Sequence, residues 1–256
     1  MIVVDRITWL RVILRWHGSA LQKVWRRVLF STVLATGVTV TYQYHDTMFH
    51  EALTPLPFTL IGVALGIFLG FRNNASYDRF WEGRKLWGGM VNTTRTMTRQ
   101  VLTLVGPQEP DEESLATRKA LIYRTIAYSH ALRKHLRDDR DFEELRPFLP
   151  EAEFAKLELE LNPPISILQR MGDEFRRCWN LGWVHPMHFP ALEATLTEFT
   201  NLQGGCERIK STPIPFSFNI LLHRIVAVYC VTLPIGIIDQ VGYRTHAVVA
   251  MVSSAF

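Results

Sequence analysis

The sequence predicts an all-α membrane protein with four transmembrane helices per subunit and a helical cytoplasmic domain between the second and the third. Hydrophobic residues make up 48% of the 256 positions, yet 20% are charged, and the two kinds of residue are segregated along the chain. The apolar residues fall into four blocks, and one long polar segment separates the second block from the third. No segment shows the alternation of a strand over a useful length. These observations exclude an ordinary β or α/β fold.

Each apolar block is interpreted as a membrane span. The blocks are Val28–Tyr42, Leu53–Phe71, Pro215–Ile238 and His246–Phe256. The second has no charged residue and is close to the ~20 residues that a helix needs to cross the hydrocarbon core. The first is shorter and requires flanking residues that tilt or snorkel, and the fourth is cut off by the end of the chain. Core helices of a soluble protein are the alternative, which four separate blocks disfavour.

Charges flanking the spans predict their orientation. Before the first span stand basic residues, Arg6, Arg11, Arg15, Lys23, Arg26 and Arg27, against one acid, Asp5. The loop before the second span has Asp46 and Glu51 and no Lys or Arg, and basic residues return directly after Phe71. The positive-inside rule therefore predicts a multi-pass protein of the cell (inner) membrane, with its N-terminus and central domain in the cytoplasm. No secretory signal is recognised.

Three regions follow from this topology. Residues 1–72 should hold an N-terminal interfacial helix, with Val3, Ile7, Leu10 and Leu14 on one face, and transmembrane helices 1 and 2. Residues 73–212 should form the helical cytoplasmic domain. Residues 213–256 should hold transmembrane helix 3 and the start of transmembrane helix 4.

The cytoplasmic domain is predicted to be a set of helices. The second span should continue unbroken from Arg72 to Val105, and a helix that opens at Glu113 and Ser114 should follow. On that helix Ile122, Ile126, Ser129, Leu132 and Leu136 share a face. Two shorter helices and a final helix with Leu192, Leu196, Phe199 and Leu202 complete the domain. Gly204 and Gly205 are expected to make a turn after it.

Nothing in the sequence indicates an enzyme, and no catalytic residue or cofactor is expected. No phosphate-binding loop, dinucleotide loop, nucleophile elbow or metal-binding helix motif is recognised, nor any nucleic-acid motif. His185 and His188 with Cys178 are the best candidates for a metal site, but Pro186 breaks helical spacing, so a solvent-facing turn is favoured. Cys206 as a nucleophile is disfavoured. Cys178, Cys206 and Cys230 are odd in number and widely spaced, which fits reduced thiols.

The second span carries two parallel stripes. Gly62, Gly66 and Gly70 recur every fourth residue, and Val63, Ile67 and Phe71 follow one position behind. Small residues at this spacing let helices approach closely in lipid, so the glycines are predicted to pack against other helices. The bulky stripe would face lipid, a bundle core or a pore. Because four spans cannot enclose a water path, a pore would require symmetric subunits.

Two segments carry a specific resemblance: "IFLGFRNNASYDRFWEGRKLWG" (67–88) and "GGCERIKSTPIPFSFNILLHR" (204–224). They resemble the bestrophin family of ion channels, close to its bacterial branch, and the likeness extends over nearly the whole chain. The resemblance implies a homopentamer around one axial pore. Its partners would be its own copies, the lipid bilayer and permeant monovalent ions.

Residue roles follow from the same resemblance. Val63, Ile67 and Phe71 would form three apolar rings of a hydrophobic neck, which acts as a dewetting barrier and gate. Met187 would form a second constriction at the cytoplasmic mouth, where His185 and His188 would sense pH, since a free histidine titrates near pH ~6.5. Arg79, Phe80 and Trp81 match a structural element after the neck. The chain stops at Phe256, before the acidic cluster of calcium-gated relatives, so calcium control is unsupported and the C-terminus is interpreted as truncated.

The ion and two other functions stay open at this stage. Relatives implied by the resemblance carry either anions or monovalent cations, so chloride and sodium or potassium are both candidates. A membrane-anchored sensor or scaffold, whose cytoplasmic domain binds a partner without ion conduction, is one alternative. A transporter is another, although Arg224 is the only strong intramembrane charge and the two halves do not repeat.

Overall fold

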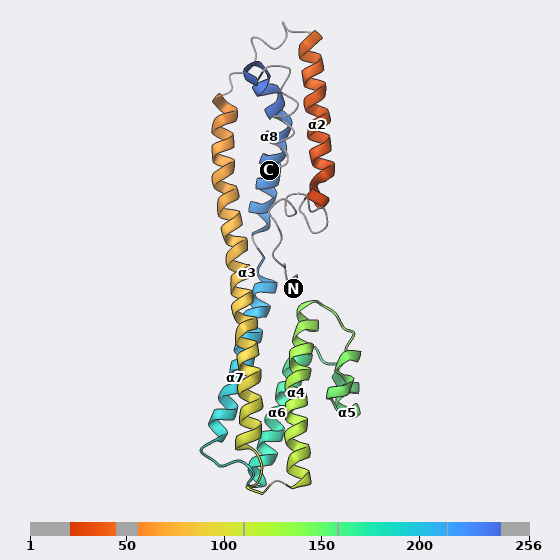
Figure 1. The fold of residues 1–256 in the computed structure, drawn as a ribbon, viewed down its shortest axis with the longest axis vertical. Coiled ribbons are helices and arrows are strands. Elements are labelled where there is room, and N and C mark those ends of the chain that lie inside the picture. The colour runs from red at the N-terminus through yellow and green to blue at the C-terminus, as the bar shows by residue number, and fades with distance from the viewer. Residues whose placement is uncertain (1–20, 45–55, 110, 158, 214, 242–256) are drawn as a thin grey trace, which may run out of the picture. The chain divides into compact units, whose positions relative to one another are not determined.

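The computed structural model describes residues 21–44, 56–109, 111–157, 159–213 and 215–241, and every regular element in these ranges is helical (Figure 1). The α-helices are α2 (Leu21–Tyr44), α3 (Leu56–Leu104), α4 (Glu112–Leu136), α5 (Glu151–Leu157), α6 (Pro163–Asn180), α7 (Phe189–Ser211) and α8 (Phe216–Val241), with one 3₁₀ helix, η2 (Glu143–Phe148). The predicted interfacial helix, the loop with Asp46 and Glu51, and the fourth span lie outside the described residues.

The chain divides into two compact units. Unit 1 comprises residues 1–74 and 214–256, and unit 2 comprises residues 75–213. The helix α3 contributes to both units, because its 49 residues form one continuous helix. The prediction that the second span continues without a break past Arg72 is therefore confirmed. That unit 1 lies in the membrane and unit 2 in the cytoplasm stays a prediction.

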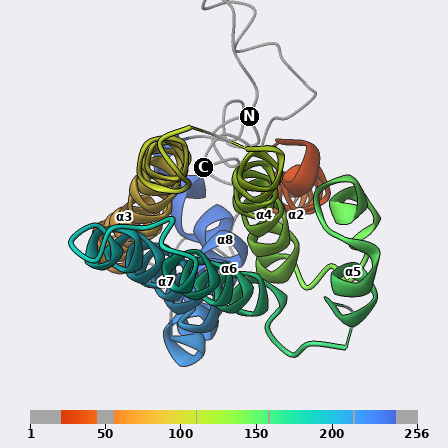
Figure 2. The same ribbon diagram turned by 90° about the horizontal axis from the view of Figure 1, so that it is seen from below.

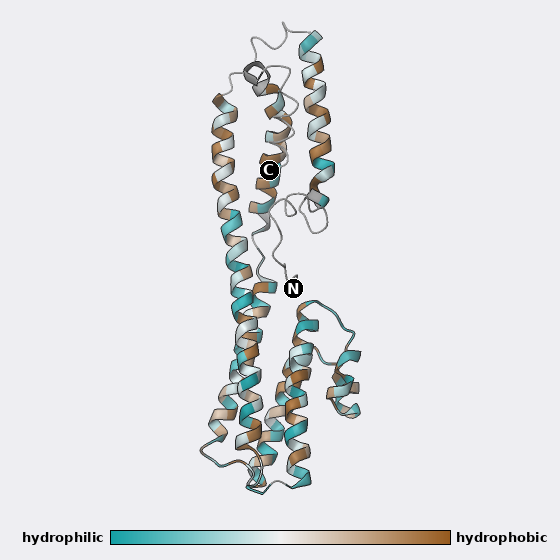
Figure 3. Cartoon of the chain, in the orientation of Figure 1, coloured by the Kyte–Doolittle hydropathy of each residue, from teal (hydrophilic) through white to brown (hydrophobic). Residues whose placement is uncertain are grey.

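Two of the described helices are long and apolar enough to cross a membrane, namely α3 and residues Phe218–Gly236 of α8. In Figure 3 the apolar colouring of the first part of α3 gives way to hydrophilic colouring further along the helix. The predicted first span lies within α2, which is not one of these two helices. Four threonine hydroxyls of α2 donate hydrogen bonds of 2.8–2.9 Å to carbonyl oxygens four residues earlier, so these hydroxyls have internal partners.

In unit 1, α8 packs against α2 and runs antiparallel to the first part of α3 (Figure 1). A Cβ atom built on Gly236 would lie 2.1 Å from the ring of Phe58, and one on Gly62 would lie 2.8 Å from the hydroxyl of Tyr229. Further along, the rings of Phe68 and Phe218 meet edge to face at 6.3 Å between centroids. Residue numbers rise along α3 as they fall along α8, which establishes the antiparallel register.

In unit 2, α6 lies between α4 and α7 when the helices are viewed end-on (Figure 2). The core includes side chains from α3, α4, α6 and α7, among them Met97, Tyr128, Met171, Phe175 and Phe199, each fully buried. A capping box opens α4, because the Asp111 carboxylate accepts from the Ser114 amide while the Ser114 hydroxyl accepts from the Asp111 amide. The predicted start of this helix is confirmed to within a residue or two.

One detail of the predicted helices is wrong, and the burial along α4 adds another. Gly204 and Gly205 do not form a turn, because both lie inside α7, which continues to Ser211. Gly205 is buried there against Leu86 of α3, so its lack of a side chain serves helix packing. On α4, Leu132 is buried in the core, whereas Ile122, Ile126 and Ser129 are only half-buried and line a surface groove beside α3.

Candidate ion pathway

The bulky stripe of the second span is exposed along α3 in unit 1. Val63, Ile67 and Phe71 are 61%, 55% and 63% exposed in the single chain. Successive members lie one helical turn, about 5.4 Å, apart. By contrast Leu65, on the opposite side of the helix, is 5% exposed. An apolar stripe of this exposure on a helix long enough to cross a membrane must meet lipid, other subunits or a pore.

The glycine stripe divides into two parts. Gly62 is covered within the chain by Tyr229 of α8. Around Gly66 and Gly70, in contrast, an added Cβ atom would meet no described atom within 4 Å. These two positions are therefore open to the close approach of another helix. That another helix packs there stays a prediction.

The candidate cytoplasmic constriction lies in unit 2, in the turn that precedes α7. His185, Met187 and His188 are all exposed, and Met187 is 79% exposed. The imidazole centroids of His185 and His188 are 5.5 Å apart. The Met187 amide donates to Nδ1 of His185 at 3.2 Å, so a neutral His185 carries its proton on Nε2. This turn presents a flexible apolar side chain between two imidazoles.

The cysteine and metal alternatives find little support in the geometry. Cys178 is fully buried in the core of unit 2, while His185 and His188 are exposed. Burial raises the pKa of the Cys178 thiol to about 11 and also raises the pKa of the Cys206 thiol. Within the described ranges, no group of three or more His, Cys, Asp or Glu side chains is placed to hold a metal ion.

Arg79 connects α3 to the end of α7. The sequence predicted only that Arg79, Phe80 and Trp81 form a structural element after the neck. Its guanidinium Nη2 donates to the Ile209 carbonyl at 2.5 Å, and Nη1 donates to the Thr212 carbonyl. Both carbonyls belong to the end of α7, whose last carbonyl groups have no partners within the helix. Arg79 thereby fixes the end of α7 to α3.

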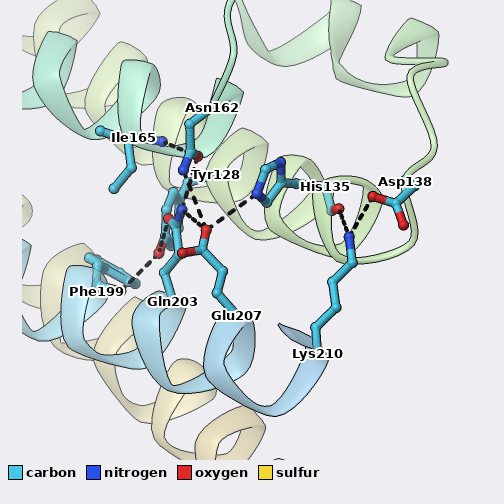
Figure 4. A network of polar contacts seen from close by, with 9 residues as sticks. All are labelled: Tyr128, His135, Asp138, Asn162, Ile165, Phe199, Gln203, Glu207 and Lys210. Carbon is cyan, nitrogen blue, oxygen red and sulfur yellow. Dashed lines mark hydrogen bonds and ion pairs between the residues drawn. The ribbon is translucent and has the colours of Figure 1, made fainter. Parts of the chain in front are cut away.

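A polar network between α4, α6 and α7 was not predicted (Figure 4). The buried Tyr128 hydroxyl donates to the Phe199 carbonyl at 2.9 Å, and the Gln203 amide donates to Asn162 Oδ1 at 2.9 Å and Glu207 Oε1 at 2.7 Å. His135 Nε2 lies 3.3 Å from the same Glu207 oxygen. Such a network has no local sequence signature, because its members are brought together only by packing of the three helices.

Comparison with known proteins identifies the family. The family model described as "Bacterial/Fungal Bestrophin protein" matches residues 1–256. A Ralstonia nicotianae protein named "voltage-dependent anion channel-forming protein" is 36% identical over all of this chain and 82% of its own length. A similarly named Escherichia coli K12 protein is 34% identical over the same shares.

A solved structure gives the same result. The crystal structure of a bacterial bestrophin homologue from Klebsiella pneumoniae that carries a point mutation has a TM-score of 0.83 and 32% sequence identity. The match covers 94% of this chain and 85% of that chain. The resemblance noted for residues 67–88 and 204–224 is confirmed by these matches: the chain belongs to the bacterial and fungal bestrophin family.

Proposed function

We propose that this chain forms a homopentameric channel in the cell membrane and that small anions pass through a neck lined by Val63, Ile67 and Phe71. The observation that carries the proposal is the apolar stripe itself, whose three side chains are each more than half exposed in the single chain. Membership of the bestrophin family supports a channel rather than an enzyme. We propose anions rather than sodium or potassium as the permeant ions, because similar proteins are named for forming anion channels.

The chemistry of the neck supports a gate rather than a binding site. Side chains of Val, Ile and Phe offer an ion no ligand to replace its water, so a narrow ring of them empties of water and blocks conduction. Widening such a ring by a small amount restores water and current. Ion selectivity must then come from the width of the pore and from the charges near it.

Assembly would use the open part of the glycine stripe. In the proposed pentamer Gly66 and Gly70 lie at contacts between helices, where a side chain would hold the backbones apart. Gly66→Leu should therefore convert the pentamer to smaller species in native mass spectrometry from detergent. Gly37→Leu on α2 is the matched control, because a Cβ atom there also meets nothing within 4 Å of the described chain. A monomeric mass for the unmodified protein would contradict the assembly.

Reconstitution into planar bilayers tests conduction and its ion. Unitary currents are expected, with a reversal potential in a salt gradient that has the sign for anions. Ile67→Ala should raise conductance or open probability, because it widens the middle of the neck. Leu69→Ala is the control, since Leu69 is also exposed, at 39%, but projects about 200° from Ile67 around the helix. Leu65→Ala would be unsuitable, because truncating a buried leucine costs about 2–5 kcal/mol.

Two outcomes of this experiment reject the proposal. Equal effects of Ile67→Ala and Leu69→Ala on single-channel current would show that the stripe does not line the pore. If bilayers that contain intact pentamers show no current, a membrane-anchored sensor or scaffold would be favoured instead.

The turn before α7 is proposed as the cytoplasmic mouth. With Met187 at the constriction, the neighbouring His185 and His188 would place ten imidazoles near the axis of a pentamer. Their protonation at acidic cytoplasmic pH adds positive charge and should increase anion current relative to cation current. Currents at pH 5.5 and 7.5 from the native protein and the His185→Ala/His188→Ala variant test this role. A pH response that persists in the variant would show that His185 and His188 do not sense pH.

A further inference from the structure

A groove between α3 and α4 opens on the surface of unit 2. Its volume is about 640 Å³. Apolar side chains line it from both helices, namely Leu102 of α3 and Ile122 and Ile126 of α4. Leu102 is 52% exposed, although neighbouring Val101 is fully buried in the core. The groove therefore leaves apolar surface uncovered in the single chain.

The hydroxyl groups around the groove are already engaged. Those of Thr94, Thr98, Thr103, Thr125 and Ser129 each donate to a backbone carbonyl of their own helix, at 2.8–3.2 Å. No hydroxyl proton of these five is left for a polar ligand, so the groove is suited to apolar side chains rather than to a sugar or a nucleotide.

The rim of the groove is positively charged. Arg95 and Arg99 of α3 line it and are exposed. Neither makes an ion pair with any residue in the described part of the chain. His130 also lines the groove, but it lies 3.6 Å from Glu144, which pairs with Arg133. An occupant should thus combine apolar side chains with a negative charge that faces the two arginines.

One segment of the chain has this chemistry. Leu159 and Leu161, in the connection between α5 and α6, are 85% and 88% exposed, the highest values among large apolar residues that the structure describes. Between them stands Glu160, whose carboxylate pairs, among the described residues, only with a distant cation, Arg170 Nη2 at 3.9 Å. Two leucines and one acid are therefore presented together.

The connection is braced rather than loose. Arg140 donates to the Glu160 carbonyl at 2.9 Å, Leu157 before it is fully buried, and the Asn162 side chain accepts from the Ile165 amide at the start of α6. Fixed in this way, the leucines remain exposed and do not enter the groove of their own unit. A second copy can supply the contact that a single chain does not make.

We propose that the Leu159–Leu161 segment of one subunit inserts into the α3–α4 groove of the next, with Glu160 facing Arg95 and Arg99. The two surfaces differ, so the contact is heterologous, and it generates a ring when the rotation between subunits closes, as the proposed pentamer requires. The inference rests on the proposed homo-oligomer and names a contact that holds its subunits together.

Disulfide cross-linking tests the contact directly. Oxidation of the Leu102→Cys/Leu161→Cys variant should give a ladder of covalent oligomers on a non-reducing gel. Each single variant serves as a control, because it retains the native cysteines. If native mass shows the oligomer but the double variant cross-links no more than the single variants, the contact is wrong and the oligomer stands. A monomeric native mass would reject both the contact and the proposed assembly.

Substitutions that introduce or reverse charges provide a second test, which does not depend on cysteine chemistry. Leu159→Asp/Leu161→Asp and Arg95→Glu/Arg99→Glu should each lose the oligomer, whereas Leu115→Asp should not, since Leu115 is 53% exposed on α4 outside the groove. Adding Glu160→Lys to the Arg95→Glu/Arg99→Glu variant should restore part of the oligomer. Retention of the full oligomer in both the leucine and the arginine variants would overturn the proposal.

Discussion

The side chain of Leu202 on α7 lies directly against the backbone of Gly89 on α3. A Cβ atom on Gly89 would be 2.8 Å from Leu202 Cδ2, closer than real side chains come. The reverse contact exists one turn away, where a Cβ atom on Gly205 of α7 would be 2.7 Å from Leu86 Cδ2 of α3. Each helix thus presents a glycine to a leucine of the other, and this reciprocal contact sets how closely the two helices pack.

The first prediction compares these glycines with their direct neighbours. Gly88→Ala and Gly204→Ala should stabilise the protein by up to about 1 kcal/mol, because alanine favours the helix and a Cβ atom there meets nothing within 4 Å. Gly89→Ala and Gly205→Ala should instead destabilise it by about 1–3 kcal/mol, since a packed leucine must move. Thermal unfolding in detergent measures all four. Equal effects at Gly88 and Gly89 would contradict the reciprocal packing.

The same glycines show what the sequence could and could not predict. Hydrophobic periodicity and apolar blocks are enough to locate α3, α4, α6, α7 and α8, because hydrophobic spacing is a local property. Gly204 and Gly205 were interpreted as a turn, since two successive glycines usually break a helix. The packing role of Gly205 depends on Leu86, more than a hundred residues earlier, and no local pattern contains that information.

The candidate site shows the same limit. The exposed stripe of Val63, Ile67 and Phe71 could be located from spacing alone, but its role as pore lining came from family resemblance. Gly62 was grouped with Gly66 and Gly70 by spacing, yet Tyr229 of the same chain covers it. Contacts of Arg79 with the end of α7 depend on tertiary packing and had no signal beyond a short motif.

The second prediction concerns Arg79. Arg79→Ala should lower the free energy of unfolding by about 1–2 kcal/mol, because the Ile209 and Thr212 carbonyls lose charged donors. Arg79→Lys should recover only part of the loss, since an ammonium group cannot reproduce the planar fork of the guanidinium. Chemical denaturation followed by circular dichroism gives both values. Arg84→Ala, at an exposed position on the same helix, should be close to neutral.

The third prediction uses the thiols. Burial raises the pKa of Cys178 to about 11, so at pH 8 roughly one thiol in a thousand is ionised. The pKa of Cys206 is also raised by burial. Because the thiolate is the reactive form, iodoacetamide should label both residues only after unfolding, as peptide mass spectrometry would record. An introduced cysteine at Leu181, which is 50% exposed, should react at once. If Cys206 of the folded protein is labelled as fast as the introduced cysteine, its burial is contradicted.

The last prediction concerns Arg224 on α8. The antiparallel contacts of Gly62 with Tyr229 and of Phe68 with Phe218 place Arg224 at the level of Val63 and Ile67 along α3. Arg224 is exposed and makes no ion pair with any residue that the structure describes. A charge within a membrane span is costly and weakly screened, so an ionisable residue at this level indicates a functional site. In the proposed pentamer, five such charges around the neck would raise its potential and favour anions.

Arg224→Gln should therefore shift the reversal potential in a salt gradient toward the value for cations, without loss of the pentamer. Arg137→Gln removes the same charge from an exposed position after α4 and should leave the reversal potential unchanged. The comparison separates a local field from a change in net charge, because both variants lower the charge of each subunit by one. If Arg224→Gln pentamers keep the native reversal potential, Arg224 does not act on the permeating ion, and the preference for anions must arise elsewhere along the pore.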